Sequence, residues 1–238
     1  MQIVAALPRT VFVRFARAAA VGIVCLCATG SAAAADLEVR VRAAGAPLDD
    51  VVVAVHGGAA TPGAARQHVV DQVDKRFVPH VAAIRVGDRV SFPNSDDIRH
   101  HVYSFSPAKS FELPLYHGIP SEPVTFEQPG KVVLGCNIHD RMSAYVYVLT
   151  AERFALAADG TARFPDLASG RYEIALWHPR QAPASENMRR AVTLGDEDAA
   201  LAFELALEPR STAVPTTLSP LEAKFRALRE QATTDEGG

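Results

Sequence analysis

Three side chains able to bind a transition metal lie close together in the segment GCNIHDRM, residues 135–142. Two residues separate Cys136 from His139, and two more separate His139 from Met142. A thiolate, two imidazoles and a weak thioether form the ligand set of a mononuclear blue-copper centre. Soft sulfur donors favour Cu(I), whereas imidazoles bind both oxidation states. The segment therefore predicts a copper site that supports one-electron cycling, provided that a second histidine comes from elsewhere in the chain.

The segment FPNSDDIRHHVYSF, residues 92–105, supplies two candidates for that histidine. A strand that begins at this point turns His100 and His101 to opposite faces, because successive side chains of a β-strand alternate. Only one of the two can point at the metal. The alternation leaves the choice between His100 and His101 open.

Other chemistries fit the segment less well. Zinc accepts Cys and His, but structural zinc sites favour several thiolates. A dinuclear copper centre needs a second thiolate. A Cys–His nucleophile needs an imidazole that a separate element orients, whereas His139 shares a tight loop with Cys136. A purely structural role for these residues is the remaining alternative.

The first 35 residues have the layout of a secretory signal peptide. Three arginines precede an apolar run over residues 18–28, and Ala33-x-Ala35 offers a cleavage site. The apolar run is shorter than the roughly 20 residues of a membrane span, although an N-terminal anchor is the alternative. We therefore expect an exported, periplasmic protein with no membrane span after processing.

Processing would leave Cys136 as the one cysteine of the chain, because Cys25 and Cys27 lie in the predicted leader. A lone cysteine in an oxidising compartment is a reactive thiol, an intermolecular bridge or a metal ligand. The leader contains three Arg and no acidic residue, so its removal changes the formal net charge from −3 to −6. This mildly acidic balance argues against a nucleic-acid partner.

The remaining sequence is predicted to be almost entirely β. Short apolar segments separated by Gly and Pro turn signals are typical of a β-sandwich or barrel. The predicted strands lie within residues 36–45, 49–58, 68–97, 100–105, 124–136, 143–150, 159–179, 189–195 and 200–208. Residues 107–123 are interpreted as a Pro-rich meander without a strand.

Part of the chain resembles the cupredoxins, a family of blue-copper proteins. The segment FVPHVAAIRVGDRVSFPNSD resembles the family's run before the first ligand, and DIRHHVYSF resembles its H-N-V strand. GCNIHDRM followed by SAYVYV resembles the ligand loop and final strand, with the short C-x2-H-x2-M spacing of amicyanin. The layout also resembles exported plastocyanin-like proteins grouped with methylamine utilisation.

This resemblance implies one copper ion per chain, cycling between Cu(I) and Cu(II), on a Greek-key β-sandwich. By position it implies the ligands His100, Cys136, His139 and Met142. The chain departs from the family at His101, where an asparagine usually tethers the ligand loop. The hypothesis that follows is a replacement tether, in which His101 and Asn137 hydrogen-bond each other.

A second, smaller β-sandwich is predicted around the copper domain. Its turn signals at Asp159-Gly160 and in SGRY, residues 169–172, resemble a carboxypeptidase-regulatory-like sandwich. The copper domain is either inserted into this sandwich or followed by it. The predicted division is a signal peptide (1–35), first sandwich strands (36–62), copper domain (63–150), small sandwich (151–210), and linker with a short amphipathic helix (211–238).

Two classes of function fit these features. The first is a periplasmic electron carrier, not an enzyme, that exchanges single electrons with a partner such as a dehydrogenase or a cytochrome. The alternative is a copper-binding or protein-interaction module of the cell envelope, which delivers or senses copper. Both functions need the same four ligands, so the sequence does not separate them.

Overall fold

The computed structural model describes residues 34–58, 63–120, 122–151, 153–185 and 188–209. Strands dominate these residues, and the helical element among them is the 3₁₀-helix η1 (Pro183–Ser185). The prediction of an all-β protein is confirmed. Within the described part of the chain, no helix has the length and hydropathy that crossing a membrane requires. The predicted C-terminal helix and residues 1–33 of the predicted leader lie outside the described residues.

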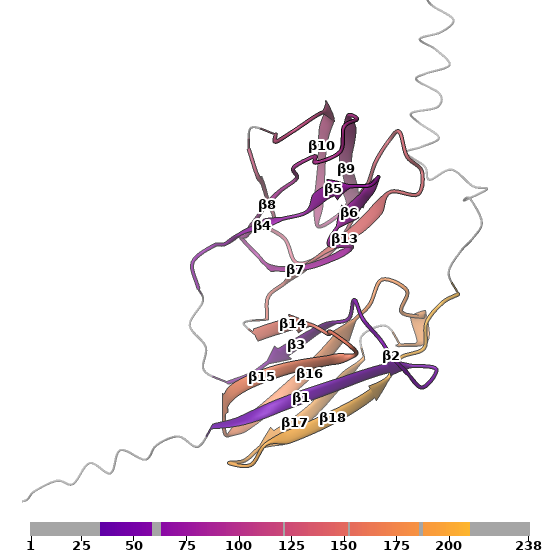
Figure 1. Cartoon of the computed structure of the whole chain (residues 1–238). Helices are drawn as coiled ribbons and strands as arrows, with labels where there is room; N and C mark the ends of the chain where they lie inside the picture. The colour runs from indigo at the N-terminus through magenta and orange to yellow at the C-terminus, as the bar shows by residue number, and fades with distance from the viewer. Residues whose placement is uncertain (1–33, 59–62, 121, 152, 186–187, 210–238) are drawn as a thin grey trace, which may run out of the picture. The chain divides into compact units, whose positions relative to one another are not determined.

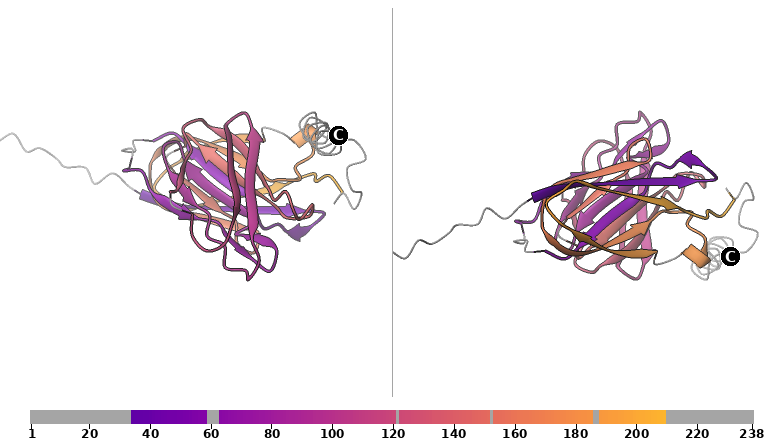
Figure 2. Two further views of the ribbon diagram at one scale, coloured as in Figure 1. Left: turned by 90° about the horizontal axis from the view of Figure 1, so that it is seen from above. Right: turned by 90° about the horizontal axis from the view of Figure 1, so that it is seen from below.

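One β-sandwich combines strands from the two ends of the described chain. Its strands are β1 (Ala34–Ala43), β2 (Ala46–Pro47), β3 (Val52–His56), β14 (Arg153–Leu156), β15 (Thr161–Ala168), β16 (Gly170–Trp177), β17 (Arg189–Leu194) and β18 (Ala199–Glu204). One sheet has the order β15-β1-β18, with β2 beside β1, and the other has the order β14-β3-β16-β17. Figure 1 shows β3 beside β16, and Figure 2 shows β1 running alongside β18.

These pairings join segments that are more than a hundred residues apart. Val53 of β3 is opposite Leu176 of β16, and Val39 of β1 is opposite Leu201 of β18. Alternate side chains of each strand point inward, and buried valines, leucines and aromatic residues of both sheets form one core. The small sandwich is therefore built from strands on both sides of the segment 63–150.

A second sandwich lies between these two segments in sequence. Its strands are β4 (Gln67–Val69), β5 (Asp71–Val73), β6 (Arg76–Val78), β7 (Val81–Arg85), β8 (Arg89–Ser91), β9 (His100–Ser106), β10 (Lys109–Tyr116), β11 (Val124–Thr125), β12 (Gly130–Gly135) and β13 (Ser143–Leu149). A five-stranded sheet with the order β10-β9-β12-β13-β7 faces a three-stranded sheet with the order β11-β8-β4, and β5 and β6 form a hairpin. Their buried side chains form a separate core that includes Cys136 and Met142.

Strand β10 occupies residues for which the sequence predicted a meander, so that prediction is wrong. Pro114 argued against a strand because proline cannot donate a ladder hydrogen bond. However, β10 is an edge strand of the five-stranded sheet, and its register with β9 shifts between Leu113 and Tyr116. An edge position tolerates proline, because one side of the strand needs no partner.

Strand β1 begins two residues before the predicted start of the processed chain. Ala34 and Ala35 pair with Ala168 and Leu167 of β15, and Ala35 is buried. The predicted leader therefore overlaps the small sandwich by these two residues.

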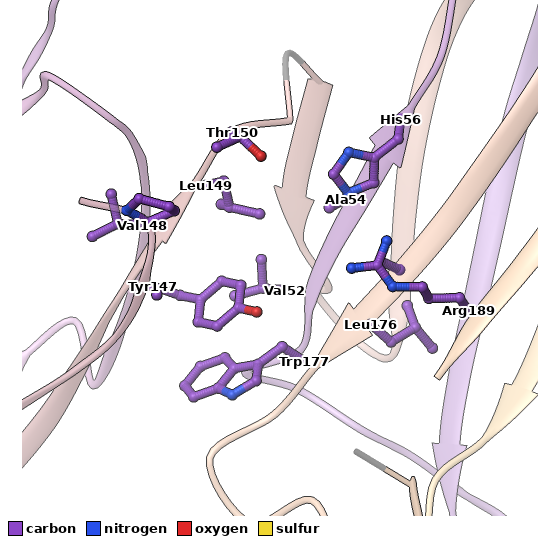
Figure 3. Close-up of a pocket in the computed structure, with 13 residues that line it drawn as sticks. Val52, Ala54, His56, Tyr147, Val148, Leu149, Thr150, Leu176, Trp177 and Arg189 are labelled. Carbon is purple, nitrogen blue, oxygen red and sulfur yellow. The ribbon is translucent and has the colours of Figure 1, made fainter. Parts of the chain in front are cut away.

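The two sandwiches contact each other through a small apolar cluster. Val52 and Ala54 of β3 are buried in one group with Val81 of β7 and Leu149 of β13. Beside this group, the ring of Trp177 stacks on Tyr147 at a centroid distance of 4.5 Å and an interplanar angle of 14°. Figure 3 shows this stack at the wall of a cavity of about 250 Å³. None of Cys136, His139 and Met142 lines this cavity.

Candidate metal centre

The structure brings three of the predicted ligands together at one end of the second sandwich. His100 is the first residue of β9, and Cys136 immediately follows β12. These two strands are neighbours, with Gly135 opposite Tyr103. His100 and Cys136 are buried, and His139 is half-buried. Pairing of β9 with β12 is therefore what brings together residues that are 36 positions apart.

The donor atoms have the separations that a bound metal ion needs. The Cys136 sulfur lies 3.7 Å from Nδ1 of His100 and 3.7 Å from Nδ1 of His139. The three donor atoms all lie within 4.8 Å of one another. A metal about 2.3 Å from sulfur and about 2.0 Å from nitrogen, with an angle of roughly 120° between them, gives a separation of about 3.7 Å. The geometry therefore fits a trigonal Cys-His-His site.

Short backbone turns give the ligand loop its shape. The N–H of His139 donates to the carbonyl of Cys136 at 3.4 Å, and the N–H of Met142 donates to the carbonyl of His139 at 2.9 Å. Two consecutive turns return the chain toward one point every three residues. Met142 is buried in the same core as Cys136.

Close packing also fixes the residue before the cysteine. A Cβ atom on Gly135 would lie 2.6 Å from Cζ of Tyr103, so the tyrosine ring covers the glycine backbone. A side chain at position 135 would therefore have to displace the ring of Tyr103. The approach of Tyr103 therefore restricts the backbone that leads into Cys136.

Asp96 is the polar partner of the buried candidate ligand His100. Its Oδ2 lies 2.6 Å from Nε2 of His100, and His100 Nδ1 is the atom that faces the Cys136 sulfur. A carboxylate on the outer nitrogen fixes the ring orientation and the tautomer, and it makes the other nitrogen a better donor. The sequence patterns did not point to this role of Asp96. The spacing of four residues between Asp96 and His100 was the available signal.

Asp96 also holds the neighbouring hairpin turn. Its carboxylate accepts the backbone N–H groups of Asp74 and Lys75 at 2.6 and 2.9 Å. Both turn residues have positive φ, 52° and 57°, as a two-residue turn between β5 and β6 favours. Burial raises the pKa of Asp96, but these two N–H groups and the His100 ring lower it by more, so its pKa is below the ordinary value. One carboxylate thus links the hairpin to the candidate ligand His100.

Asn94 anchors the loop that precedes His100. Its Nδ2 donates to the carbonyls of Ile98 and Tyr116 at 2.8 and 2.9 Å, and its Oδ1 accepts the N–H of Asp96 at 3.1 Å. Asn94 is almost fully buried, where breaking these bonds would leave polar atoms unsatisfied. The loop with Asp96 is therefore held against the end of β10.

The predicted hydrogen bond between His101 and Asn137 is not found. Nε2 of His101 lies 2.8 Å from Oε1 of Glu112, and its buried Nδ1 has no hydrogen-bond partner among the described residues. Asn137 is exposed. The reason is strand alternation, because His101 is on the outer face of β9, where Glu112 of β10 is opposite the nearby Tyr103.

The half-buried ligand-loop histidine favours its neutral form. The pKa of His139 is lowered, first by burial and then by electrostatic interactions with His100 and Lys75. A neutral imidazole has the lone pair that a metal needs. The electrostatics of the site therefore favour metal binding at neutral pH.

Comparisons with known proteins find similar solved structures but identify no family. No protein-family model matches the chain, and a search of curated proteins finds no match. A Cu-containing nitrite reductase from Thermus scotoductus SA-01 is 27% identical over 40% of this chain and 24% of its own, with a TM-score of 0.33. A purple cupredoxin from Nitrosopumilus maritimus is 22% identical over 35% of this chain and 98% of its own, with a TM-score of 0.31. An oxidized mutant of amicyanin is 20% identical over 34% of this chain and 81% of its own, also with a TM-score of 0.31.

The chain thus spans about a quarter of the nitrite reductase. Because these TM-scores are below 0.5, the copper assignment depends on the donor geometry of this chain's own residues.

Proposed function

We propose that this protein is a mononuclear copper protein that carries single electrons between redox partners. The observation that carries the proposal is the pair of 3.7 Å separations between the Cys136 sulfur and the Nδ1 atoms of His100 and His139. Copper bound there would supply a one-electron Cu(I)/Cu(II) couple. We assign the axial position to Met142, so that His100, Cys136, His139 and Met142 hold one copper ion per chain.

The residues around the site support electron transfer by limiting rearrangement. His100 is held by Asp96, and the loop that precedes it is held by Asn94. Cys136 and Met142 are packed in the core of the sandwich. A site that keeps one geometry in both oxidation states exchanges electrons with little reorganisation, which is the advantage of preorganised ligands.

A docked partner would receive the electron through His139. This imidazole is half-buried, and the neighbouring Ile138 is 47% exposed. An apolar side chain beside an accessible ligand suits the small, transient interfaces of redox partners. We propose a dehydrogenase or a cytochrome as the partner class, in the periplasm, after export directed by residues 1–35. The role is that of a carrier and not of an enzyme.

A copper-binding or interaction module of the cell envelope is the second candidate function. It is favoured by the small sandwich, which contacts the copper-type domain through Val52, Ala54 and the Trp177–Tyr147 stack. A freely diffusing electron carrier does not need a second domain of this kind. In this function the same ligands deliver or sense copper.

Electron exchange separates the two functions. The copper-loaded protein is studied by voltammetry, and its self-exchange rate is measured by NMR line broadening in mixtures of Cu(I) and Cu(II) protein. A reversible couple with fast self-exchange supports the carrier. Tight copper binding with slow self-exchange refutes the carrier and favours the module. Cys136→Ser, which removes the thiolate, is the control that shows whether the couple belongs to this site.

A further inference from the structure

The cavity of about 250 Å³ between the two sandwiches combines small apolar side chains with an aromatic wall. Val52 and Ala54 of β3 line it with Ala175 of β16, and strand pairing places Ala54 opposite Ala175. The stacked rings of Trp177 and Tyr147 stand beside them (Figure 3). Protein interiors contain few voids larger than a water molecule. Small residues next to a large aromatic pair therefore leave space in which a ligand can bind.

Polar groups lie on one side of this cavity. His56 is the last residue of β3 and Arg189 is the first residue of β17, and both line the cavity together with Tyr147. Figure 3 shows the Tyr147 hydroxyl and the Arg189 guanidinium pointing toward the same part of the cavity. Burial raises the pKa of Tyr147 above its ordinary value, and the positive charge of Arg189 partly offsets this rise. The guanidinium therefore acts electrostatically on the cavity wall.

Arg189 and His56 can both donate hydrogen bonds to a ligand. Nη1 of Arg189 lies 2.5 Å from Oε1 of Glu173, but a guanidinium carries further N–H groups that remain available. The His56 side chain has no hydrogen-bond partner among the described residues. Glu173 is opposite His56 in the ladder but does not line the cavity. The described side chains that line the cavity therefore include a permanent positive charge and no carboxylate.

The two sides of the cavity define the chemistry of a matching ligand. The planar guanidinium of Arg189 fits the two oxygens of a carboxylate, and a flat ring packs favourably against the aromatic pair of Tyr147 and Trp177. Small-molecule sites occur preferentially at domain interfaces and measure about 300–1,000 Å³. A cavity of about 250 Å³ is slightly smaller than this range, which favours a ligand with a single ring.

We propose that this cavity binds a small aromatic carboxylate, with its ring against Tyr147 and Trp177 and its carboxylate on Arg189 and His56. The ligand contacts both sandwiches at once, because Tyr147 belongs to β13 and the other three residues belong to the small sandwich. This gives the small sandwich a binding role of its own. The residues proposed to hold copper do not line the cavity, so the proposal is independent of the copper function.

Tryptophan fluorescence tests the proposal, because Trp177 is the single tryptophan of the chain. The exported protein is titrated with benzoate, with benzyl alcohol, which has the ring without the charge, and with acetate, which has the carboxylate without the ring. Benzoate should change the emission of Trp177 saturably and bind at least about tenfold more tightly than either control, since a hydrogen bond to a charged group contributes roughly this factor.

Three variants locate the binding site. Arg189→Gln should weaken benzoate binding about tenfold and leave the weaker binding of benzyl alcohol unchanged. Arg190→Gln is the matched control, because it removes the same charge from the next residue, whose guanidinium contacts the ring of Phe203 and the carbonyl of Ala202 instead. Glu173→Gln should tighten benzoate binding severalfold, because it removes the carboxylate that competes for Arg189.

A cavity-filling variant keeps the test decisive if Arg189→Gln perturbs folding. Ala175 is half-buried at the cavity wall, so Ala175→Leu occupies the space of the ring without changing a polar group. Benzoate binding should then be lost, and isothermal titration calorimetry measures this loss independently of fluorescence. Equal affinities of the wild type for benzoate and benzyl alcohol would overturn the proposal. An unchanged benzoate affinity in Arg189→Gln or in Ala175→Leu would overturn it as well.

Discussion

Replacing Asp96 by asparagine should raise the reduction potential of the copper site. The change keeps the shape of the side chain but removes its negative charge, which lies 2.6 Å from Nε2 of His100. Reduction lowers the charge of the metal by one, so a nearby carboxylate stabilises the oxidised form more than the reduced form. Removing that charge therefore favours reduction.

The magnitude follows from the geometry. A metal bound at Nδ1 of His100 lies about 6–7 Å from the Asp96 carboxylate, across the imidazole ring. Two unit charges at this separation interact with about 2.5 kcal/mol at an effective dielectric of about 20. That energy corresponds to about 100 mV, because a tenfold change is 59 mV for one electron. Because the Asp96 side chain is 12% exposed, solvent screens part of this interaction, and we expect a rise of about 50–100 mV.

Voltammetry of the copper-loaded variants measures the effect. Asp97→Asn is the matched control, because it removes the same charge from an exposed neighbour with no contact to His100 among the hydrogen bonds described. Its potential should stay within about 20 mV of the wild type, since exposed charges are screened. Copper content and the visible band are recorded first, so that loss of metal is distinguished from a change in potential. An Asp96→Asn potential equal to that of Asp97→Asn would refute the reasoning.

Three further changes test the packing and electrostatics of the two sandwiches. Burial raises the pKa of Asp88, but two backbone N–H groups and a histidine lower it by more, so its pKa in the folded protein is below the ordinary value. The contribution of Asp88 to the free energy of unfolding is therefore complete above the unfolded pKa near 3.8. It is lost as the pH falls through the lower pKa of the folded state. Denaturant titrations should show that Asp88→Asn costs about 2–3 kcal/mol at pH 7 and progressively less below pH 4, whereas the exposed Asp196→Asn changes little at either pH. Gly135→Ala should lower the free energy of unfolding by about 1–3 kcal/mol in denaturant titrations, because the new methyl group clashes with Tyr103. The same change should shift the visible copper band. An unchanged band would show that this contact does not position the ligand loop. Trp177→Ala should lower the free energy of unfolding by about 3 kcal/mol with copper affinity unchanged in a competition titration, and a large loss of affinity would contradict the separation of the two sites.

The sequence predicted the β-sandwich class because its signals are local. Alternating valines and Gly or Pro turns mark strands such as β7, β12 and β13 without any tertiary information. Strand β10 was missed because Pro114 is allowed only at a sheet edge, and edge position is a property of the assembled sheet. The tight spacing of Cys136, His139 and Met142 was equally local, and the short turns of the loop show how that spacing brings donors together.

The contacts around the ligands depend on pairings that no local pattern contains. The role of Asp96 could not be predicted because its hydrogen bonds go to the β5–β6 hairpin and to His100, and the first of these partners lies more than twenty residues away. His101 was expected to contact Asn137, but Glu112 is its partner through the pairing of β9 with β10. Predicting such contacts requires knowing the register between neighbouring strands. A one-residue change of register would move each side chain to the opposite face of the sheet.

Optical and EPR spectra of the Cu(II) protein test the central claim most directly. The exported protein is compared with its Cys136→Ser variant at equal copper loading. We expect an intense thiolate-to-copper band in the visible region and a narrow copper hyperfine splitting, both absent from the variant. A colourless copper-loaded protein, or spectra unchanged by the substitution, would contradict a copper site built on Cys136.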